Sequence, residues 1–507
     1  MRAAGAELTD PRRPELLSRV LSGFSWVLAS QALAQILSTA SLVLLARLLA
    51  PREFGIAAMA QVATAFVITY SDLGLGLALV QKESITETDR STVFWASIAL
   101  GALMSVVCVA VAPLVARFYH TAEVKPLLDV LALSFLFTGM GSTHRSLQFR
   151  AMNYRALEIR SMVAAILGTV VTIIVALAGG GAWALILGTV VSTAASSILL
   201  IAMGGWRPRA VFSWPSLREL GAFGMRYVGG TTFLTLNQNA DNILVGRVLG
   251  QAALGTYNLA YSVILVPISR VASPACQLMA PAFARLQNDK PALTANWLRG
   301  TRLLLMVFLP LMLTVAVSAP DIVHIVFGTK WDGAIPVIRI LASVCALLSI
   351  QGLADSALQA VGAMRTYLRM KALSFVLNIT AFFVGIQWGL VGMATAFGIS
   401  TLLFILLYLV VVSRALKAPT WCFAPALFGV TIAAAVLVIV EIGVYDLLQS
   451  TAVGSIVQLG ATGLAGLFAF ALGCFCLERR ALLELIRFGT TALPVPRRLI
   501  PSALQSA

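Results

Sequence analysis

The stretch Leu45–Ala60 reads LARLLAPREFGIAAMA, and a related stretch at Val245–Ala260 reads VGRVLGQAALGTYNLA. Four of the sixteen positions are identical, and each pair is separated by 200 residues: Arg47/Arg247, Leu49/Leu249, Gly55/Gly255 and Ala60/Ala260. A second pair of segments, GAWALILGTVVST at 181–193 and GLVGMATAFGIST at 389–401, aligns in the same order. Two matches in one order predict that the chain contains two copies of one structural repeat.

The composition predicts that both copies are built from membrane-spanning helices. Hydrophobic residues make up 59% of the chain and charged residues only 11%, whereas about 25% of residues are charged in ordinary soluble domains. One helical crossing of a bilayer needs about 20 apolar residues. We therefore expect a polytopic membrane protein with almost no soluble part. The first apolar run, from about Leu21, has no convincing small-residue cleavage site and is expected to remain as the first helix.

Apolar runs divide the chain into about fourteen helices. The predicted helices are 21–44, 54–80, 92–114, 127–148, 159–179, 182–203, 219–246, 252–281, 300–319, 334–361, 369–388, 390–413, 422–446 and 452–476. Six predicted helices separate the segment 45–60 from its match at 245–260. Because this number is even, both copies are expected to have the same orientation in the membrane. The expected fold is an all-α integral membrane protein with two pseudo-symmetric six-helix lobes plus a C-terminal helix pair. This is the plan of a two-lobed transporter.

The boundaries of these parts follow from the helix pattern. We expect a cytoplasmic N-terminal tail at 1–20, an N-terminal lobe at 21–203, a cytoplasmic linker at 204–218, a C-terminal lobe at 219–413, the terminal helix pair at 422–476 and a cytoplasmic C-terminal tail at 477–507.

The net charge of +15 is distributed as in an oriented membrane protein. With the N-terminus in the cytoplasm, 27 Lys and Arg residues fall in cytoplasmic segments and 6 on the opposite side, and three more, Arg226, Arg270 and Arg339, fall inside helices. Lys and Arg are retained on the cytoplasmic side of membranes. The split predicts that both termini are cytoplasmic. The basic clusters lack the aromatic interleaving of a nucleic-acid-binding face.

The sequence contains no motif of a known catalytic centre. There is no GxxxxGK[ST] sequence for a nucleotide phosphate, no GxSxG and no HExxH. The six cysteines lie in or beside apolar segments and the three histidines are far apart in the sequence. We therefore expect no catalytic residue, no metal site and no cofactor, and a protein that is not an enzyme.

Arginines inside helices are the leading candidates for a substrate site. A charged group in the bilayer is costly and usually faces a cavity or a partner. Arg226 and Arg270 both lie in the cytoplasmic halves of their helices, and a guanidinium matches phosphate oxygens. They predict a cationic cavity for a phosphate-bearing substrate. The alternative is that they snorkel to the interface or pair with a carboxylate.

A second group of candidates lies in the segment LNQNADNILVGR at 236–247. Its amides and carboxylate could bind sugar hydroxyls or, equally, pair helices at the outer rim; these residues are Asn237, Asn239, Asp241 and Asn242. Three further residues are candidates for coupling or gating: Asp72, Asp355 and Arg145. Asp72 could instead serve as a helix-end cap before Gly74.

Several of these passages together resemble one transporter family. They are LARLLAPREFGIAAMA, DLGLGLALVQ, FYHTAEVKPLLDVLALSFLFTGMGSTHRSLQFR, NADNILVGRVLGQAALGTYNLAYSVILVP and PAFARLQND. Over residues 20–415 the chain resembles the polysaccharide transport family of the multidrug/oligosaccharidyl-lipid/polysaccharide exporter superfamily. The resemblance is to the Wzx-type flippases of the colanic acid and exopolysaccharide exporter branch.

The resemblance implies a function and a place in the cell. It implies a flippase in the bacterial inner membrane that moves oligosaccharide repeat units on undecaprenyl diphosphate to the periplasmic leaflet, for exopolysaccharide or lipopolysaccharide biosynthesis. It also implies a central cationic cavity, a monomer in membrane lipid, and a polysaccharide polymerase and co-polymerase as partners. Two alternatives remain: a cation-coupled multidrug exporter of the same superfamily, for which twelve helices are expected, and a membrane glycan polymerase or ligase, for which a large outer loop is expected.

Overall fold

The computed structural model describes residues 35–71, 74–450, 454–479 and 481–485. The side chains at 68–71, 222–234, 265–275 and 277–278 lie outside this description, although the backbone there is helical. Every regular element in the described residues is a helix. The chain divides into two compact units, Met1–Gly255 and Thr256–Ala507, called unit 1 and unit 2 below.

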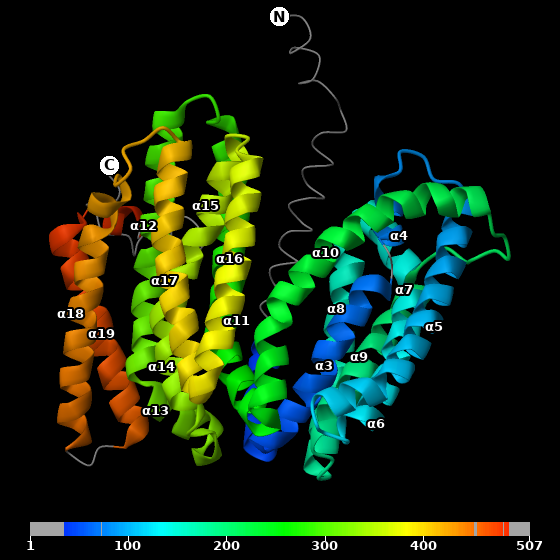
Figure 1. The fold of residues 1–507 in the computed structure, drawn as a ribbon, viewed down its shortest axis with the longest axis horizontal. Helices are drawn as coiled ribbons and strands as arrows, with labels where there is room; N and C mark the ends of the chain where they lie inside the picture. The colour runs from blue at the N-terminus through cyan, green and yellow to red at the C-terminus, as the bar shows by residue number, and fades with distance from the viewer. Residues whose placement is uncertain (1–34, 72–73, 451–453, 480, 486–507) are drawn as a thin grey trace, which may run out of the picture. The chain divides into compact units, whose positions relative to one another are not determined.

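Unit 1 is coloured blue to green in Figure 1. It contains the helix Gln35–Leu48, then α3 (Pro51–Ser71), α4 (Leu75–Gln81), α5 (Glu87–Phe118), α6 (Val124–Leu131), α7 (Leu133–Arg150), α8 (Tyr154–Leu177), α9 (Ala182–Met203) and α10 (Trp214–Val248). α11 (Gly250–Arg285) begins at the end of unit 1 and continues into unit 2.

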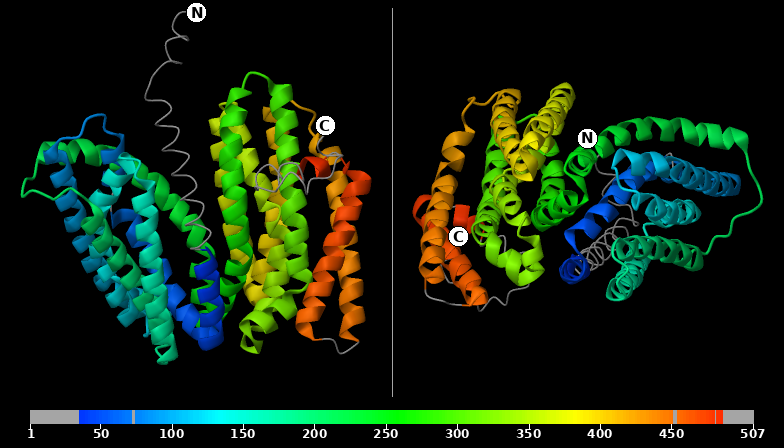
Figure 2. Two further views of the ribbon diagram at one scale, coloured as in Figure 1. Left: turned by 180° about the vertical axis from the view of Figure 1, so that it is seen from behind. Right: turned by 60° about the horizontal axis from the view of Figure 1, so that its bottom comes forward.

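Unit 2 is coloured green to red. It contains α12 (Lys290–Val317), α13 (Ala319–Ile322), η1 (Val323–Phe327), η2 (Thr329–Trp331), α14 (Ala334–Cys345), α15 (Leu348–Ala360), α16 (Met364–Gly385), η3 (Ile386–Trp388), α17 (Gly389–Ala415), α18 (Phe423–Gln449) and α19 (Ser455–Leu477). The last two helices pack along each other, and Figure 2 shows them side by side.

The surfaces of these helices match a hydrocarbon environment. Nine segments of the described chain are long and apolar enough to cross a membrane, and one of them, Met364–Ala415, contains both α16 and α17. Large apolar side chains are exposed along the helices, for example Ile439 and Phe468 at 70% and 72%. Contiguous exposure of this kind is rare on soluble proteins. The chain is therefore a multi-pass membrane protein.

The predicted helices correspond to observed ones, with differences at their ends and centres. The predicted helix 182–203 matches α9, whereas α12 begins ten residues before the predicted start because Asp289 caps it. Three predicted helices are broken: 54–80 into α3 and α4, 127–148 into α6 and α7, and 334–361 into α14 and α15. Most of the predicted helix 21–44 lies outside the described residues.

Unit 1 extends past the predicted linker. Residues 204–218 lie within it, and α10 packs on α3, α4 and α5. The side chain of Ser213 caps α10 by accepting a hydrogen bond from the Ser216 amide, which holds the turn into this helix.

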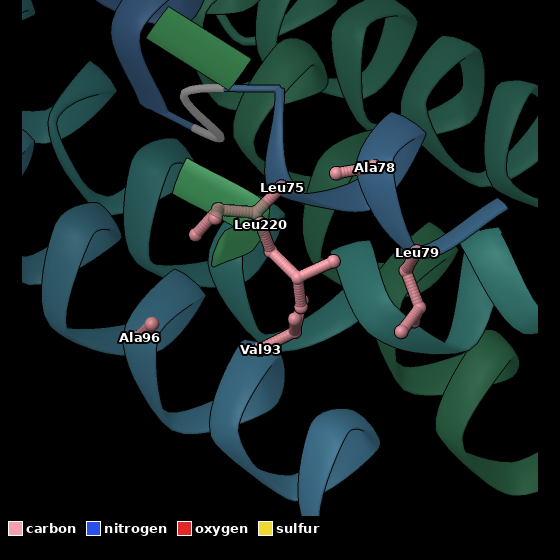
Figure 3. Packing of buried hydrophobic residues seen from close by; sticks show 6 residues of the cluster. All are labelled: Leu75, Ala78, Leu79, Val93, Ala96 and Leu220. Atoms are coloured by element: carbon pink, nitrogen blue, oxygen red, sulfur yellow. The ribbon is translucent and has the colours of Figure 1, made fainter. Parts of the chain in front are cut away.

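A small apolar core joins three of these helices, as Figure 3 shows. Leu75, Ala78 and Leu79 of α4 meet Val93 and Ala96 of α5 and Leu220 of α10, all at most 6% exposed. The short helix α4 is thus fixed in position by packing on two longer helices.

Candidate functional site

A polar cavity of about 750 Å³ opens within unit 1. It lies among α4, α7, α8, α9 and α10. Its size falls within the range of 300–1,000 Å³ that is usual for ligand pockets. Nine hydroxyl side chains line it: Thr138, Ser142, Ser146, Ser161, Ser192, Thr193, Ser196, Ser197 and Thr235. Hydroxyl groups both donate and accept hydrogen bonds, so the wall suits a ligand rich in polar groups.

Two arginines give the cavity its charge, Arg145 from α7 and Arg160 from α8. Arg160 donates a hydrogen bond from Nη1 to Ser196 Oγ at 2.7 Å and another from Nη2 to Ser161 Oγ at 2.8 Å. Its Nε donates to the carbonyl oxygen of Leu157 at 3.3 Å. The serine hydroxyls are neutral, so they orient the guanidinium without cancelling its charge.

Arg145 is exposed to the cavity and makes no hydrogen bond or ion pair within the described residues. The two guanidinium groups repel each other. Among the described lining residues there is no Asp or Glu. Glu158 of α8 acts on the charge of Arg160 from outside the lining. The wall itself presents two positive charges, which favours an anionic ligand. Arg145 was predicted as a coupling or gating residue, and the structure places it on the cavity wall.

Arg150, at the end of α7, holds the helix that forms one wall of the cavity. Its Nη1 donates to the carbonyl oxygens of Leu79 and Val80, each at 3.1 Å, and to that of Lys82. Its Nη2 donates to the carbonyl of Glu83 at 2.7 Å. A cation at the C-terminus of a helix satisfies its last carbonyls and complements its dipole. Arg150 therefore fixes the end of α4.

A polar cluster fastens the same end of α4 to α5 and α10. Asp89 is 4% exposed and forms a capping box with Thr86, and its carboxylate also accepts a hydrogen bond from Ser216. Lys82 Nζ lies 3.3 Å from Asp89 Oδ2 and 3.0 Å from Glu219 Oε2. The hydrogen bond to Glu219 raises the pKa of the Lys82 ammonium above its ordinary value. These contacts supply the charge partners that buried polar groups require.

An apolar groove of about 640 Å³ lies beside α4. Its walls come from α4, α5 and the start of α10; they include Leu75, Trp95, Ala99, Leu100, Leu103, Phe212, Trp214, Leu217 and Arg218. On α4, Gly76, Leu77 and Val80 line the polar cavity, whereas Leu75 lines the groove. The short helix thus separates a polar compartment from an apolar one.

The amide-rich segment predicted to bind sugar does not line this cavity in the described residues. Asn239 Nδ2 donates to the Thr235 carbonyl one turn back at 2.8 Å. Asp241 is 5% exposed and accepts a hydrogen bond from the Asn242 amide at 2.8 Å. Asn237 is half-buried. The predicted role of these residues stays a prediction.

The four remaining predicted residues are not placed at the cavity, three because they lie outside the described residues and one because it lies in unit 2. Asp72 and the side chains of Arg226 and Arg270 lie outside the described part of the chain, although the backbones of the two arginines belong to α10 and α11. Asp355 lies in unit 2, where it is paired: Lys371 Nζ lies 2.7 Å from Oδ2 and the Tyr408 hydroxyl donates to Oδ1 at 2.6 Å. These contacts join α15, α16 and α17.

Arg160 is not among the site residues predicted from the sequence. It lies at the start of the predicted helix 159–179, whereas α8 already begins at Tyr154, so Arg160 lies within the observed helix. A signal was present in VVSTAASS at 190–197, where small polar residues recur on an otherwise apolar helix. Within the described residues no group of His, Cys, Asp and Glu could hold a metal ion.

Comparisons with known proteins agree with this picture. A family model described as "Polysaccharide biosynthesis protein" matches residues 44–336. The lipopolysaccharide biosynthesis protein WzxC of Escherichia coli (strain K12) is 26% identical over 385 residues, 75% of this chain and 78% of that protein. The teichuronic acid biosynthesis protein TuaB of Bacillus subtilis (strain 168) is 26% identical over 351 residues, 69% of this chain and 73% of that protein.

A solved structure shows the same fold. The inward closed conformation of the lipid II flippase MurJ superposes with a TM-score of 0.70 and 14% sequence identity, covering 90% of this chain and 99% of that one. The match to the family model covers more than half of the chain, and the predicted resemblance is confirmed. The chain belongs to the polysaccharide biosynthesis protein family.

Proposed function

We propose that this protein is a flippase that moves undecaprenyl-diphosphate-linked oligosaccharide repeat units from the cytoplasmic to the periplasmic leaflet. The observation that carries the proposal is that two different compartments lie on α4. One is a hydroxyl-lined cavity with Arg145 and Arg160, and the other is an apolar groove. A lipid-linked oligosaccharide has the same two parts, a polar anionic head group and an apolar chain.

The chemistry of each compartment fits one part of this substrate. A diphosphate diester carries about two negative charges and matches two guanidinium groups, which bind phosphate oxygens through planar, paired donors. The serine and threonine side chains of α7 and α9 can exchange hydrogen bonds with sugar hydroxyls. The groove offers apolar and aromatic side chains to the polyprenyl chain, with Arg218 at its edge.

The printed names of similar proteins support the substrate class. WzxC is named for lipopolysaccharide biosynthesis and TuaB for teichuronic acid biosynthesis. MurJ is named a lipid II flippase. By analogy, we assign this chain to the supply of repeat units for exopolysaccharide or lipopolysaccharide biosynthesis, as a transporter that performs no covalent chemistry.

The proposal includes the cellular arrangement inferred from the sequence. The protein lies in the bacterial inner membrane with both termini in the cytoplasm, as about fourteen helices in two six-helix lobes plus a terminal pair. It acts as a monomer by alternating access and passes its cargo to a polysaccharide polymerase and co-polymerase. An inside-negative potential favours outward movement of the anionic head group, by about 2.3 kcal/mol per charge per 100 mV.

The terminal helix pair favours this function over a multidrug exporter of the same superfamily. Twelve helices are expected for such an exporter, and α18 and α19 are two further spans that follow α17.

The test is complementation of a strain in which the gene is deleted. The strain should accumulate lipid-linked saccharide on the cytoplasmic leaflet and export no polymer. Arg145→Ala and Arg160→Ala should each reduce polymer export by about tenfold or more, because a hydrogen bond to a charged group contributes about 1.5–3 kcal/mol. Arg117→Ala is the matched control, since this exposed arginine of α5 lies outside the cavity.

The double variant Arg145→Ala/Arg160→Ala decides the site assignment. If it is folded, is present in the membrane at the wild-type level and still exports polymer fully, the arginine cavity is not the head-group site. If the deleted strain accumulates no lipid-linked saccharide, the proposed function itself fails.

A further inference from the structure

Glu441 is a carboxyl group in the middle of an apolar helix pair that the transport site does not use. It lies on α18, a candidate membrane span, and its exposed fraction is 0%. A charged side chain at the centre of a membrane helix costs about 2.5–3.5 kcal/mol on insertion scales. Acidic residues therefore occur there when the structure gives them a partner or a function.

Three helices enclose the Glu441 carboxyl. The hydroxyl of Thr314 on α12 donates a hydrogen bond to Oε1 at 2.5 Å. On the other side lies Gly466 of α19, where a Cβ atom would come 2.6 Å from Glu441 Cδ. Only a residue without a side chain leaves room for the carboxyl there. Thr462, one turn before Gly466 on the same face of α19, is also completely buried.

Two buried polar atoms at this point are unpaired within the described residues: Glu441 Oε2 and Thr462 Oγ1. Buried polar groups are rarely left without a hydrogen bond, because each such group costs about 1–3 kcal/mol. A proton on Oε2 would turn that oxygen into a hydrogen-bond donor. The same proton would leave Oε1 as the acceptor for Thr314.

No cation neutralises Glu441 in the described structure. Near the C-terminal end of α18, Tyr445 interacts electrostatically with Asp321, Arg339 and Asp446. The basic residue of α12 nearest to Thr314 in sequence is Arg302, about 18 Å away along the helix. It is already engaged, with Nη1 lying 3.1 Å from Glu478 Oε2. An ionised Glu441 would therefore be a buried charge without a partner.

We propose that Glu441 is a proton-binding site, and that the bound proton holds the helix pair α18–α19 against α12. One end of the pair is fastened to α12 by the ion pairs Arg302–Glu478 and Arg299–Glu484, the latter at 2.7 Å. Opposite the middle of α19, the contact depends on the neutral carboxyl. Loss of the proton leaves a bare carboxylate among three helices, which favours separation of the pair from α12 and entry of water.

Infrared spectroscopy of the purified full-length protein tests the protonation state directly. At neutral pH the wild type should show the carbonyl stretch of a protonated carboxyl group, and Glu441→Gln should lack it. Asp446→Asn is the matched control, because this carboxyl lies on the same helix but is exposed. A spectrum in which Glu441→Gln removes no protonated-carboxyl band at neutral pH overturns the proposal.

Thermal unfolding against pH tests the link to helix packing. A carboxyl that is neutral when folded and ionises when unfolded stabilises the fold below the ordinary Glu value of about 4.3, and the stability declines as the pH rises above it. The melting temperature of the wild type should fall over this range relative to that of Glu441→Gln, which cannot ionise. The proposal is overturned if the melting temperatures of the wild type and Glu441→Gln change with pH in parallel. It is also overturned if sodium ions at constant pH stabilise the wild type, since the site would then bind sodium and not a proton.

Thr314→Val serves if Glu441→Gln does not fold. It removes the hydrogen bond to Oε1 and should shift the frequency of the protonated-carboxyl band. An unchanged band in this variant contradicts the assignment. None of these measurements requires transport, so they can fail while the proposed flippase function stands.

Discussion

Gly55 and Gly255, separated by 200 residues in the chain, lie against each other's helices with no room for a side chain on either. A Cβ on Gly55 would meet the backbone of Gln251, and a Cβ on Gly255 would lie 2.8 Å from the carbonyl carbon of Pro51 and 2.9 Å from the Gly55 nitrogen. Pro51 and Gln251 are also 200 residues apart. The contact is therefore reciprocal, and it joins the two segments that the sequence predicts to be copies of one repeat.

Substituting Gly255 by Ala should destabilise this contact, because backbone atoms cannot move aside as a flexible side chain can. We expect a loss of about 1–3 kcal/mol, the usual cost of overpacking, measured by unfolding in detergent. Gly443→Ala on α18 is the control, since nothing lies within 4 Å of its Cβ position. Equal stability of Gly255→Ala and the wild type would show that α3 and α11 can move apart at this contact without cost.

Asp89 should matter more for stability than Glu219, although both carboxylates contact Lys82. Asp89 is buried and also binds Thr86 and Ser216, so Asp89→Asn should cost about 1–3 kcal/mol. Glu219 has a side chain that is 63% exposed, so Glu219→Gln should cost less than about 1 kcal/mol. Melting temperatures of the two variants, compared at neutral pH, check this order, and a reversed order contradicts it.

The Lys82–Glu219 contact also predicts a pH dependence. Because this hydrogen bond raises the pKa of Lys82, its contribution to stability is complete below the unfolded value of about 10.4 and is lost as the pH rises further. Glu219→Gln should therefore differ from the wild type at neutral pH and converge with it in strongly alkaline solution. A difference that persists there would mean that the contribution is not electrostatic.

The ion pair between Asp355 and Lys371 is expected to stabilise helix packing in unit 2. Removing one partner leaves the other charged and half-buried, so Asp355→Ala and Lys371→Ala should each destabilise the protein. The double variant should be more stable than the sum of the two effects predicts, with a coupling energy of about 0.5–3 kcal/mol. A coupling energy near zero, measured in the same unfolding assay, would mean that the ion pair does not stabilise the fold. It would leave the predicted role of Asp355 in coupling or gating of transport as the better interpretation.

Much of the fold could be predicted because lipid imposes a length and a polarity on each helix. α9 was predicted at its observed bounds, and the terminal pair α18–α19 within three residues at each end. The breaks near Ala132 and Ala346 were not predicted, because apolar residues continue across them and hydropathy carries no information about a change of helix direction. Near Gly74, a helix-end cap at Asp72 was only an alternative, and 54–80 was predicted as one helix.

The site was predicted less well than the fold. The cationic cavity predicted from Arg226 and Arg270 stays a prediction, because their side chains lie outside the described residues. The observed cavity carries Arg145 and Arg160 instead. Arg160 was not singled out because it lies at the start of the predicted helix 159–179, where a basic residue is common. The cavity wall is made of serine and threonine, which are nearly neutral on such scales and attract no attention in a membrane helix. Glu441 was passed over because a single carboxyl does not interrupt an apolar run of 27 residues.

Arg145 and Arg160 should respond differently to replacement by lysine. Arg160 binds Ser161 and Ser196 through separate nitrogens of its planar guanidinium, and a lysine ammonium is a point charge that cannot reproduce this fork. Arg145 makes no such contacts in the described residues, so Arg145→Lys keeps its charge without breaking any. Polymer export should therefore be reduced more by Arg160→Lys than by Arg145→Lys, and the opposite order would show that the serines do not position Arg160.

The apolar groove beside α4 should be sensitive to filling if it receives the polyprenyl chain. Ala99 lies on its wall, and Ala99→Trp would occupy space inside it without adding charge. Val106→Trp is a close control, because this residue lies two turns further along the same face of α5, is 66% exposed and is not part of the groove. Both variants should reach the membrane, and only Ala99→Trp should reduce polymer export. A photoreactive polyprenyl diphosphate should label the groove in the wild type and much less in Ala99→Trp. Equal labelling and equal export in the two variants would place the lipid chain elsewhere and leave the groove as ordinary membrane-facing surface.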